Sequence, residues 1–181
     1  MRSSTATAHA RLDAAVGDFD DRNSYLTYLR CLQAFREPLE MALDRSALPA
    51  EFAGWLPIRL APAIASDRED LEGTVSPFLA GRALAAPEPR SPSHAVGMVY
   101  VLEGASLGAQ VLARRARDLG FDETHGASHL GGRKDSLTNW REFLVRLEAV
   151  EGLDMEAAEA GAQETFLTAT EAFTGSTYVE A

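Results

Sequence analysis

Apolar residues recur every three or four positions along most of this chain, and that spacing limits the possible folds more than any other feature. The clearest case is the range 24–45, where one face of a predicted helix carries Tyr25, Tyr28, Leu29, Leu32, Phe35, Leu39 and Leu43. A helix with this pattern buries one stripe against its neighbours. Pro38 lies within the range and is expected to kink or disturb the helix, because proline lacks an N–H donor.

The same spacing predicts the other helices, and no stretch alternates in the manner of a strand. Ser3 and Ser4 are candidate N-caps for the first helix, and Gly120 is placed to stop a long central one. Prolines break the range 48–73 into shorter helical pieces, and the range 85–94 holds three prolines and predicts a surface connection. We therefore predict an all-α fold, a single domain over 1–181, with further helices over 3–16, 94–119, 136–150 and 154–173 and a glycine-rich loop over 123–136.

Composition narrows the functional classes. The 181 residues carry a formal net charge of −10, which disfavours nucleic acid as a partner. The chain has no run of 18 apolar residues, and its first residues lack the apolar core of a signal peptide, so neither a membrane nor export is expected. The single cysteine, Cys31, lies in an apolar helical context and predicts a small buried side chain. These features favour a cytoplasmic protein.

Two glycines four residues apart, Gly104 and Gly108, interrupt the apolar stretch YVLEGASLGAQVL. Glycine costs about 1 kcal/mol relative to alanine inside a helix, so the pair needs an explanation. Without side chains the two positions leave a flat patch one turn long. Either another helix packs closely against this patch or a flat, rigid ligand lies on it.

Histidine is the second candidate for chemistry. His9 shares an apolar stripe with Leu12 and Val16, whereas His94, His125 and His129 lie in loop-like contexts and are expected to be exposed. A histidine on an apolar face is either a hydrogen-bonded core residue or a ligand. Asp13 follows one turn after His9, where its carboxylate could fix the tautomer and orientation of the imidazole.

Other catalytic motifs are not found. The chain contains no P-loop sequence and no dinucleotide-binding glycine fingerprint, and it has no nucleophile elbow. It also lacks the cysteine and histidine spacings of zinc sites and the Glu-x-x-His pairs of di-iron bundles.

The two candidate features meet in one resemblance. The sequence resembles the bacterial haem oxygenases, especially those found beside bacteriophytochromes, through MRSSTATAHARLD, YVLEGASLGAQVL and HLGGRKDSLTNWREFLVRL. The resemblance implies a helical bundle with haem between a proximal and a distal helix. It implies that His9 is the proximal iron ligand and that Gly104 and Gly108 let the distal backbone approach the haem face.

The resemblance also implies roles for residues outside these three. Arg2 corresponds to a basic position that pairs with a haem propionate, and Tyr100 to a tyrosine on the propionate side. Tyr178 matches a C-terminal aromatic residue near the haem edge. One position departs from the family pattern: Ala105 replaces the serine that usually follows the first glycine, and the next residue, Ser106, carries the hydroxyl instead.

By resemblance, the reaction is oxidative cleavage of haem to biliverdin, CO and ferrous iron, with O2 and electrons from an external reductase or a ferredoxin-type donor. Gly104, Ser106 and Gly108 are then the catalytic stretch, and a bacteriophytochrome is a possible acceptor of the biliverdin. Ala105 leaves two alternatives open: a relative that binds haem or a partner protein without catalysis, and a haem-free scaffold in which His9 is a core residue.

Overall fold

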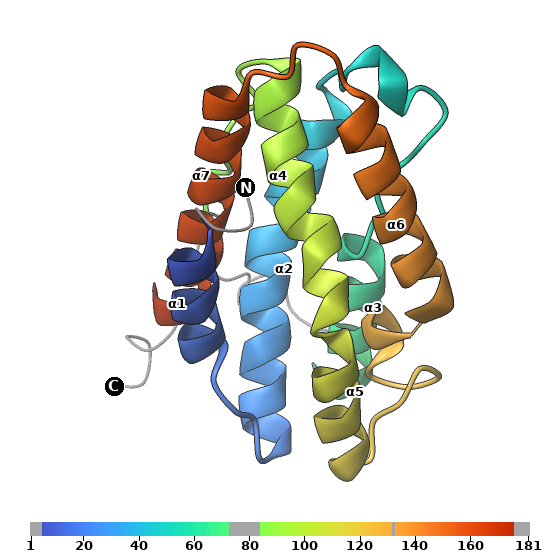
Figure 1. Ribbon diagram of the computed structural model, residues 1–181. Coiled ribbons are helices and arrows are strands. Elements are labelled where there is room, and N and C mark those ends of the chain that lie inside the picture. Colours follow the sequence, from blue (N-terminus) through green and yellow to red (C-terminus); the bar gives the residue numbers. More distant parts are fainter. Residues whose placement is uncertain (1–4, 73–83, 132, 176–181) are drawn as a thin grey trace.

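The computed structural model describes residues 5–72, 84–131 and 133–175, and in these ranges it is all-α (Figure 1). Isolated β-bridges occur around Asp122, but no strand forms in the described ranges. The helices are α1 (Ala6–Val16), α2 (Arg22–Asp44), α3 (Ala61–Glu72), α4 (Pro92–Gly104), α5 (Ala109–Asp118), α6 (Arg133–Ala149) and α7 (Met155–Thr174). The short 3-10 turns are η1 (Ala50–Phe52), η3 (Ala105–Leu107) and η4 (Ser128–Leu130).

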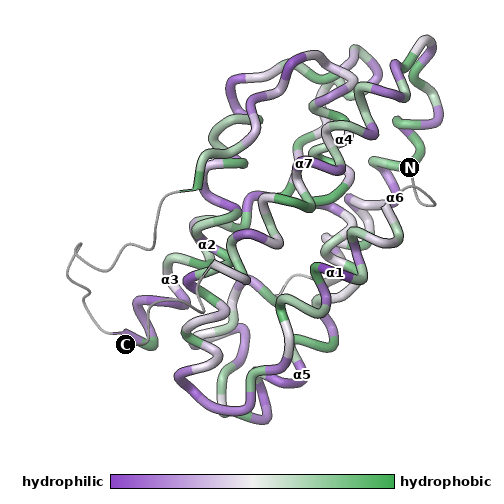
Figure 2. The backbone as a smooth tube through the Cα atoms, turned by 90° about the vertical axis from the view of Figure 1, so that its left-hand side faces the viewer, coloured by the Kyte–Doolittle hydropathy of each residue, from purple (hydrophilic) through white to green (hydrophobic). Residues whose placement is uncertain are grey.

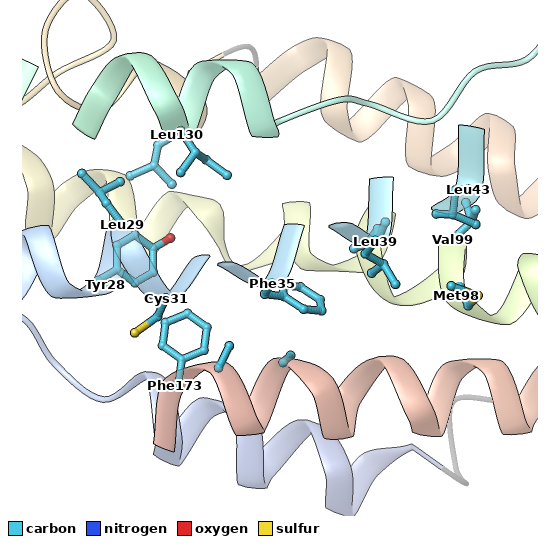
Figure 3. Packing of buried hydrophobic residues seen from close by; sticks show 14 of the residues in the cluster. Tyr28, Leu29, Cys31, Phe35, Leu39, Leu43, Met98, Val99, Leu130 and Phe173 are labelled. Atoms are coloured by element: carbon cyan, nitrogen blue, oxygen red, sulfur yellow. The ribbon is translucent and has the colours of Figure 1, made fainter. Parts of the chain in front are cut away.

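The stripe predicted on α2 forms much of the core. Tyr25, Leu29 and Leu39 are fully buried, and Cys31 is 5% exposed, as its context predicted. Figure 3 shows the side chains of this stripe following one another along α2, with Leu39 and Leu43 next to Met98 and Val99 of α4. Asp21 caps the start of α2 by accepting a hydrogen bond from the Ser24 amide.

Helix α4 is the central element, because nearly every residue from His94 to Glu103 is buried. In Figure 1 it runs between α7 and α6. Two glycines bring α4 and α7 together. A Cβ atom on Gly97 would lie 1.8 Å from the Ala158 carbonyl oxygen, and one on Gly161 would lie 2.2 Å from the His94 carbonyl oxygen. Close packing of helix backbones therefore occurs at these two glycines.

One helix prediction needs correction. The long helix expected over 94–119 is broken at the glycine pair: α4 ends at Gly104, η3 follows, and α5 continues at an angle of 46°. The low helix propensity of glycine explains why the break occurs there. Pro38 lies inside α2, which continues to Asp44. Gly120 stops α5 as predicted, with a positive φ of 87°.

A buried polar cluster fixes the end of α4. Arg36 and Glu40 of α2 form an ion pair of 2.9 Å. The Arg36 guanidinium also donates to the carbonyls of Leu102 and Ile58. Glu103 accepts the Ile58 amide at 2.7 Å and the Asn139 side-chain amide at 3.0 Å. Burial raises the pKa of Glu103, although these hydrogen bonds act in the opposite direction. The start of the η3 turn is thus held to both α2 and α6.

Among the helices described, none is by itself long and apolar enough to cross a membrane; α4–η3 and α5 meet the length and composition test together, but as a pair bent by 46°.

Candidate functional site

An uncovered apolar face lies where α4 passes through η3 into α5. Leu107 and Val111 are each 57% exposed, and they lie one turn apart. Gly104 and Gly108 fall on the same stretch: Gly108 is exposed, whereas Gly104 is half-buried and faces the Trp140 ring. Large exposed apolar side chains next to bare backbone are typical of ligand surfaces. The sequence analysis did not single out Leu107 and Val111, although their spacing of four residues was visible.

The glycine pair does not serve helix packing. A Cβ atom on Gly104 would only touch the Trp140 ring, at 3.7 Å, and one on Gly108 would only touch the Ala105 carbonyl oxygen, at 3.7 Å. Both are ordinary van der Waals distances. Both glycines also have φ angles that any residue adopts, −62° and −84°. Neither packing nor backbone conformation in the described structure therefore requires glycine at these positions, unlike Gly97 and Gly161.

His9 lies on α1 with its imidazole open to solvent. Its side chain is 60% exposed, so it is not a core histidine, and the interpretation of the chain as a scaffold with a buried His9 is wrong. Asp13 lies beside it as the spacing predicted, with its Oδ2 atom 3.0 Å from His9 Nδ1. When Nδ1 carries the proton and donates to Asp13, Nε2 keeps its lone pair for a metal.

Apolar contacts hold α1 against the bundle on the side of this face. Ala8 and Leu12, with Tyr100 of α4, pack against a small cluster that contains Val101 of α4 and Phe166 of α7. The rings of His9 and Phe166 are 5.8 Å apart, edge to face. His9 thus sits at the margin of an apolar surface shared by α1, α4 and α7.

An ion pair joins the other end of α1 to α5. Arg115 of α5 contacts Asp18 at 2.6 Å and donates to the Gly17 carbonyl. Helices α1 and α5 accordingly lie at the same end of the bundle (Figures 1 and 2). The structure therefore places the helix that carries His9 next to the elements that carry the glycine pair.

Aromatic side chains from α6 support the glycine pair from behind. Trp140 contacts the Gly104 position, lies edge to face with Tyr100 at 5.3 Å, and stacks on Phe143 at 5.6 Å. Tyr100 is thus half-buried against Trp140, one turn before Gly104. In the following turn, Ser106 Oγ is buried and has no hydrogen-bond partner in the ranges that the structure describes. Ala105, which replaces the expected serine, is exposed.

Not every predicted residue is brought to this site. Arg2 and Tyr178 lie outside the described residues. His125 is exposed as expected, but the expectation for His94 and His129 is wrong, because both are buried.

The two buried histidines have carboxylate partners that are distant in sequence. His129 Nδ1 lies 2.6 Å from Asp67, and His94 Nε2 lies 3.2 Å from Glu164. Burial lowers the pKa of His94, and the neighbouring Arg90 lowers it further. Both histidines therefore contribute to the packing of the bundle rather than to the exposed face.

A comparison with known protein families identifies the family and the fold. The family model described as heme oxygenase matches residues 1–175. The chain belongs to the haem oxygenase family. It is therefore an enzyme of the class that degrades haem.

Individual haem oxygenases are similar over most of their length. Heme oxygenase PigA of Pseudomonas aeruginosa is 30% identical over 173 residues, which cover 90% of this chain and 83% of that protein. The heme oxygenase of Xanthomonas campestris pv. campestris is 32% identical over 151 residues, covering 81% and 86%. The NO- and CO-bound heme oxygenase of Neisseria meningitidis superposes with a TM-score of 0.70 at 21% identity, covering 99% of this chain and 91% of the other.

The exposed face fits a haem group by its chemistry. A flat apolar macrocycle needs an apolar surface, which the exposed backbone at Gly108 and the side chains of Leu107 and Val111 offer. Its iron needs an axial ligand, and the exposed imidazole of His9, paired with Asp13 through Nδ1, is a suitable one.

Proposed function

We propose that this haem oxygenase cleaves haem to biliverdin, CO and ferrous iron, using O2 and electrons from a separate reductase or ferredoxin-type donor. Haem, when bound, is the substrate and also supplies the iron at which O2 is reduced. The remaining chemistry belongs to the chain: it must bind the macrocycle, limit the space above the iron, and deliver protons.

On one side of the macrocycle, His9 would bind the iron through Nε2. Asp13 accepts a hydrogen bond from Nδ1–H, which would hold the imidazole in the tautomer and orientation that leave the Nε2 lone pair free. A neutral imidazole leaves the iron able to bind O2, whereas a thiolate ligand would favour O–O cleavage. Tyr100 lies one turn before Gly104, on the proposed propionate side.

On the other side, Gly104 and Gly108 let the backbone of α4, η3 and α5 approach the macrocycle. Close approach of this backbone would limit the space for O2 at a bound iron. Ser106 lies on the same stretch, and its hydroxyl has no hydrogen-bond partner among the described residues, so we assign it to hold a water molecule that passes protons.

One observation carries this proposal. The two glycines have no packing or conformational reason in the described structure, and they lie beside two exposed apolar side chains one turn apart, Leu107 and Val111. A bound flat ligand explains both features together.

The test is an absorption time course of the purified protein with one equivalent of haemin, followed by ascorbate in air. We expect a Soret band that decays into the broad red absorption of biliverdin. A Soret band that persists under reduction would show a haem binder without catalysis and would overturn the proposal.

The His9→Ala variant tests the iron ligand. We expect it to lose the histidine-bound haem spectrum and to regain it when imidazole is added, because imidazole can occupy the space left by the side chain. The matched control is His125→Ala, which removes an exposed histidine outside the proposed site and should leave the spectrum unchanged. A wild-type spectrum from His9→Ala would contradict the assignment.

A further inference from the structure

Three charged side chains are buried together where α4 ends, and none of them has a role in the function proposed above. Arg36 and Glu40 of α2 and Glu103, the residue before Gly104, are 2%, 4% and 2% exposed. Replacing a buried ion pair by apolar side chains is often neutral or stabilising, because the charges lose their hydration on burial. A carboxylate in the last turn of a helix also faces the negative end of the helix dipole. Stability alone therefore does not account for these charges.

Arg36 joins α2 to the last turn of α4. Its guanidinium donates to the carbonyls of Leu102 and Ile58, each at 3.3 Å, and its Nε atom lies 2.9 Å from Glu40 Oε1. The last carbonyls of a helix lack partners within the helix, and a cation beside them is favourable. The last turn of α4 has no basic residue of its own, so Arg36 supplies this charge from another helix.

Glu103 and Asn139 join the same turn to α6. Glu103 accepts the Ile58 amide at 2.7 Å and the Asn139 side-chain amide at 3.0 Å, and Asn139 also donates to the Leu56 carbonyl at 3.2 Å. Hydrogen bonds have preferred directions, whereas apolar contacts allow helices to slide. The end of α4 is therefore fixed from two helices by directional bonds. We refer to the four side chains as the α4 clamp: Arg36, Glu40, Glu103 and Asn139.

We propose that the α4 clamp consists of positioning residues, which hold the backbone of the glycine pair in place against haem and thereby determine which meso carbon of the macrocycle is attacked. This inference rests on the proposed function. The clamp residues act through the η3 turn and need not touch haem themselves. A small shift of this turn would change the space for O2 at a bound iron, and misplacement of about 1 Å can change a rate by about a hundredfold.

Arg36→Lys in the full chain tests the clamp. Lysine keeps the charge beside Glu40 but lacks the planar set of donors that reaches two carbonyls. We expect amide exchange in the η3 turn of the haem-free protein to become at least about tenfold faster. Haemin affinity should change by less than about threefold, while the composition of biliverdin isomers should differ from that of the wild type. Mass spectrometry, Soret titration and chromatography measure the three quantities.

Arg68→Lys is the matched control. Arg68 also pairs with a glutamate four residues later, at 3.0 Å from Glu72, and its side chain is 16% exposed. Its hydrogen-bond partners, Gln33 and Glu72, lie on α2 and α3. Both variants should lower the melting temperature, but only Arg36→Lys should alter exchange in the η3 turn and the isomer composition. Equal changes in both variants would show a general loss of stability and would overturn the proposal.

Asn139→Leu tests the clamp from α6, and it replaces Arg36→Lys if that variant fails to fold. Leucine is similar in size but donates no hydrogen bond, so Glu103 and the Leu56 carbonyl lose a donor and the same measurements should change. Wild-type exchange and wild-type isomers would overturn the proposal. If the wild-type protein binds haem without opening it, the proposed function is wrong, and exchange in the haem-free protein still decides whether the clamp fixes the turn.

Discussion

At the scale of single residues, two pairs of glycines in this chain differ in whether the fold requires them. Gly97 and Gly161 are required because a methyl group would collide with the backbone of the facing helix. At Gly104 and Gly108 a methyl group would make only ordinary van der Waals contacts, with the Trp140 ring and with the Ala105 carbonyl oxygen. The difference comes from what faces each position, so substitutions at the two kinds of glycine should affect different properties.

Gly97→Ala should destabilise the protein by about 1–3 kcal/mol, which corresponds to a loss of several degrees in melting temperature, because it overpacks the contact of α4 with α7. Gly108→Leu should change the melting temperature of the haem-free protein little, but should weaken haem binding by about tenfold or more, since its side chain would occupy the haem face. Thermal unfolding and haemin titration measure the two effects. Equal losses of stability and affinity in Gly108→Leu would favour simple helix packing.

A second prediction concerns the Ser106 hydroxyl group in the η3 turn. Ser106→Ala should bind haem normally and slow ring opening by up to about tenfold, the value of one ordinary hydrogen bond to a water molecule. Ala105→Ser restores the hydroxyl expected after the first glycine and should raise the rate. Single-turnover decay of the Soret band measures both. A Ser106→Ala variant with a wild-type rate would remove Ser106 from the proton path.

Which residues could be anticipated from the sequence depended on how far away their partners lie. Asp13 lies one turn from His9, so their contact followed from helix geometry. The burial of His129 and His94 was missed because their carboxylate partners, Asp67 and Glu164, are 62 and 70 residues away in the chain. Gly97 and Gly161 were missed for the same reason, since only the facing helix makes them necessary.

At the scale of elements, α1 is a short helix at the margin of the site. It has 11 residues, none of them buried, and its N-cap residue Thr5 makes no side-chain capping hydrogen bond. Isolated helices shorter than about 12–15 residues are marginal in water. Its attachment comes from partly buried residues such as Leu12 and from the ion pair of Asp18 with Arg115.

Haem binding should therefore stabilise α1 selectively. Amide hydrogen exchange in Ala6–Val16 should be fast in the haem-free protein and slow when haem is bound, because ligation by His9 ties the helix to the ligand. Exchange in α4 should change much less, since that helix is already buried. Mass spectrometry of exchanged peptides measures both, and His9→Ala should remove the protection of α1. Uniform protection of all helices would contradict a specific role for α1.

Helix periodicity anticipated most elements, because α2, α6 and α7 each present a regular apolar stripe. The break between α4 and α5 was missed because the stripe continues through Gly104 and Gly108 in sequence, and only the three-dimensional structure shows the change of direction. The flat patch inferred from the glycine pair stays a prediction, because the sequence does not show which surface faces the two glycines.

At the scale of the whole molecule, acidic groups dominate, with 27 acidic and 17 basic residues. Several carboxylates are nevertheless bound within the fold. Burial alone would raise the pKa of Asp67, but hydrogen bonds from the His129 ring and amide and from Ser128 outweigh it and lower the pKa. Burial also acts to raise the pKa of Glu72, but the hydrogen bonds that its carboxylate accepts from Arg68 and Arg30 outweigh this effect and lower the pKa.

A lowered pKa in the folded state means that the stabilisation is present above the unfolded value, about 3.9 for aspartate, and is lost as pH falls through the folded value. Asp67→Asn should therefore reduce the free energy of unfolding by about 1–3 kcal/mol at pH 7, and the difference from wild type should narrow below about pH 4. Urea unfolding at pH 7, 5 and 3 measures this. The exposed Asp118→Asn is the control, and a difference that stays constant with pH would contradict the assignment.

The bend at the η3 turn also predicts how the chain tolerates change. Before the bend, the stretch from His94 to Glu103 faces protein on nearly every side, whereas Leu107, Val111 and most of their neighbours beyond it face outward. A library covering every single substitution from Pro92 to Asp118, selected for folding alone, should thus divide into two halves. Variants that still fold should be scarce up to Glu103 and abundant from Ala105 onward, although one continuous apolar pattern runs through both halves of the sequence.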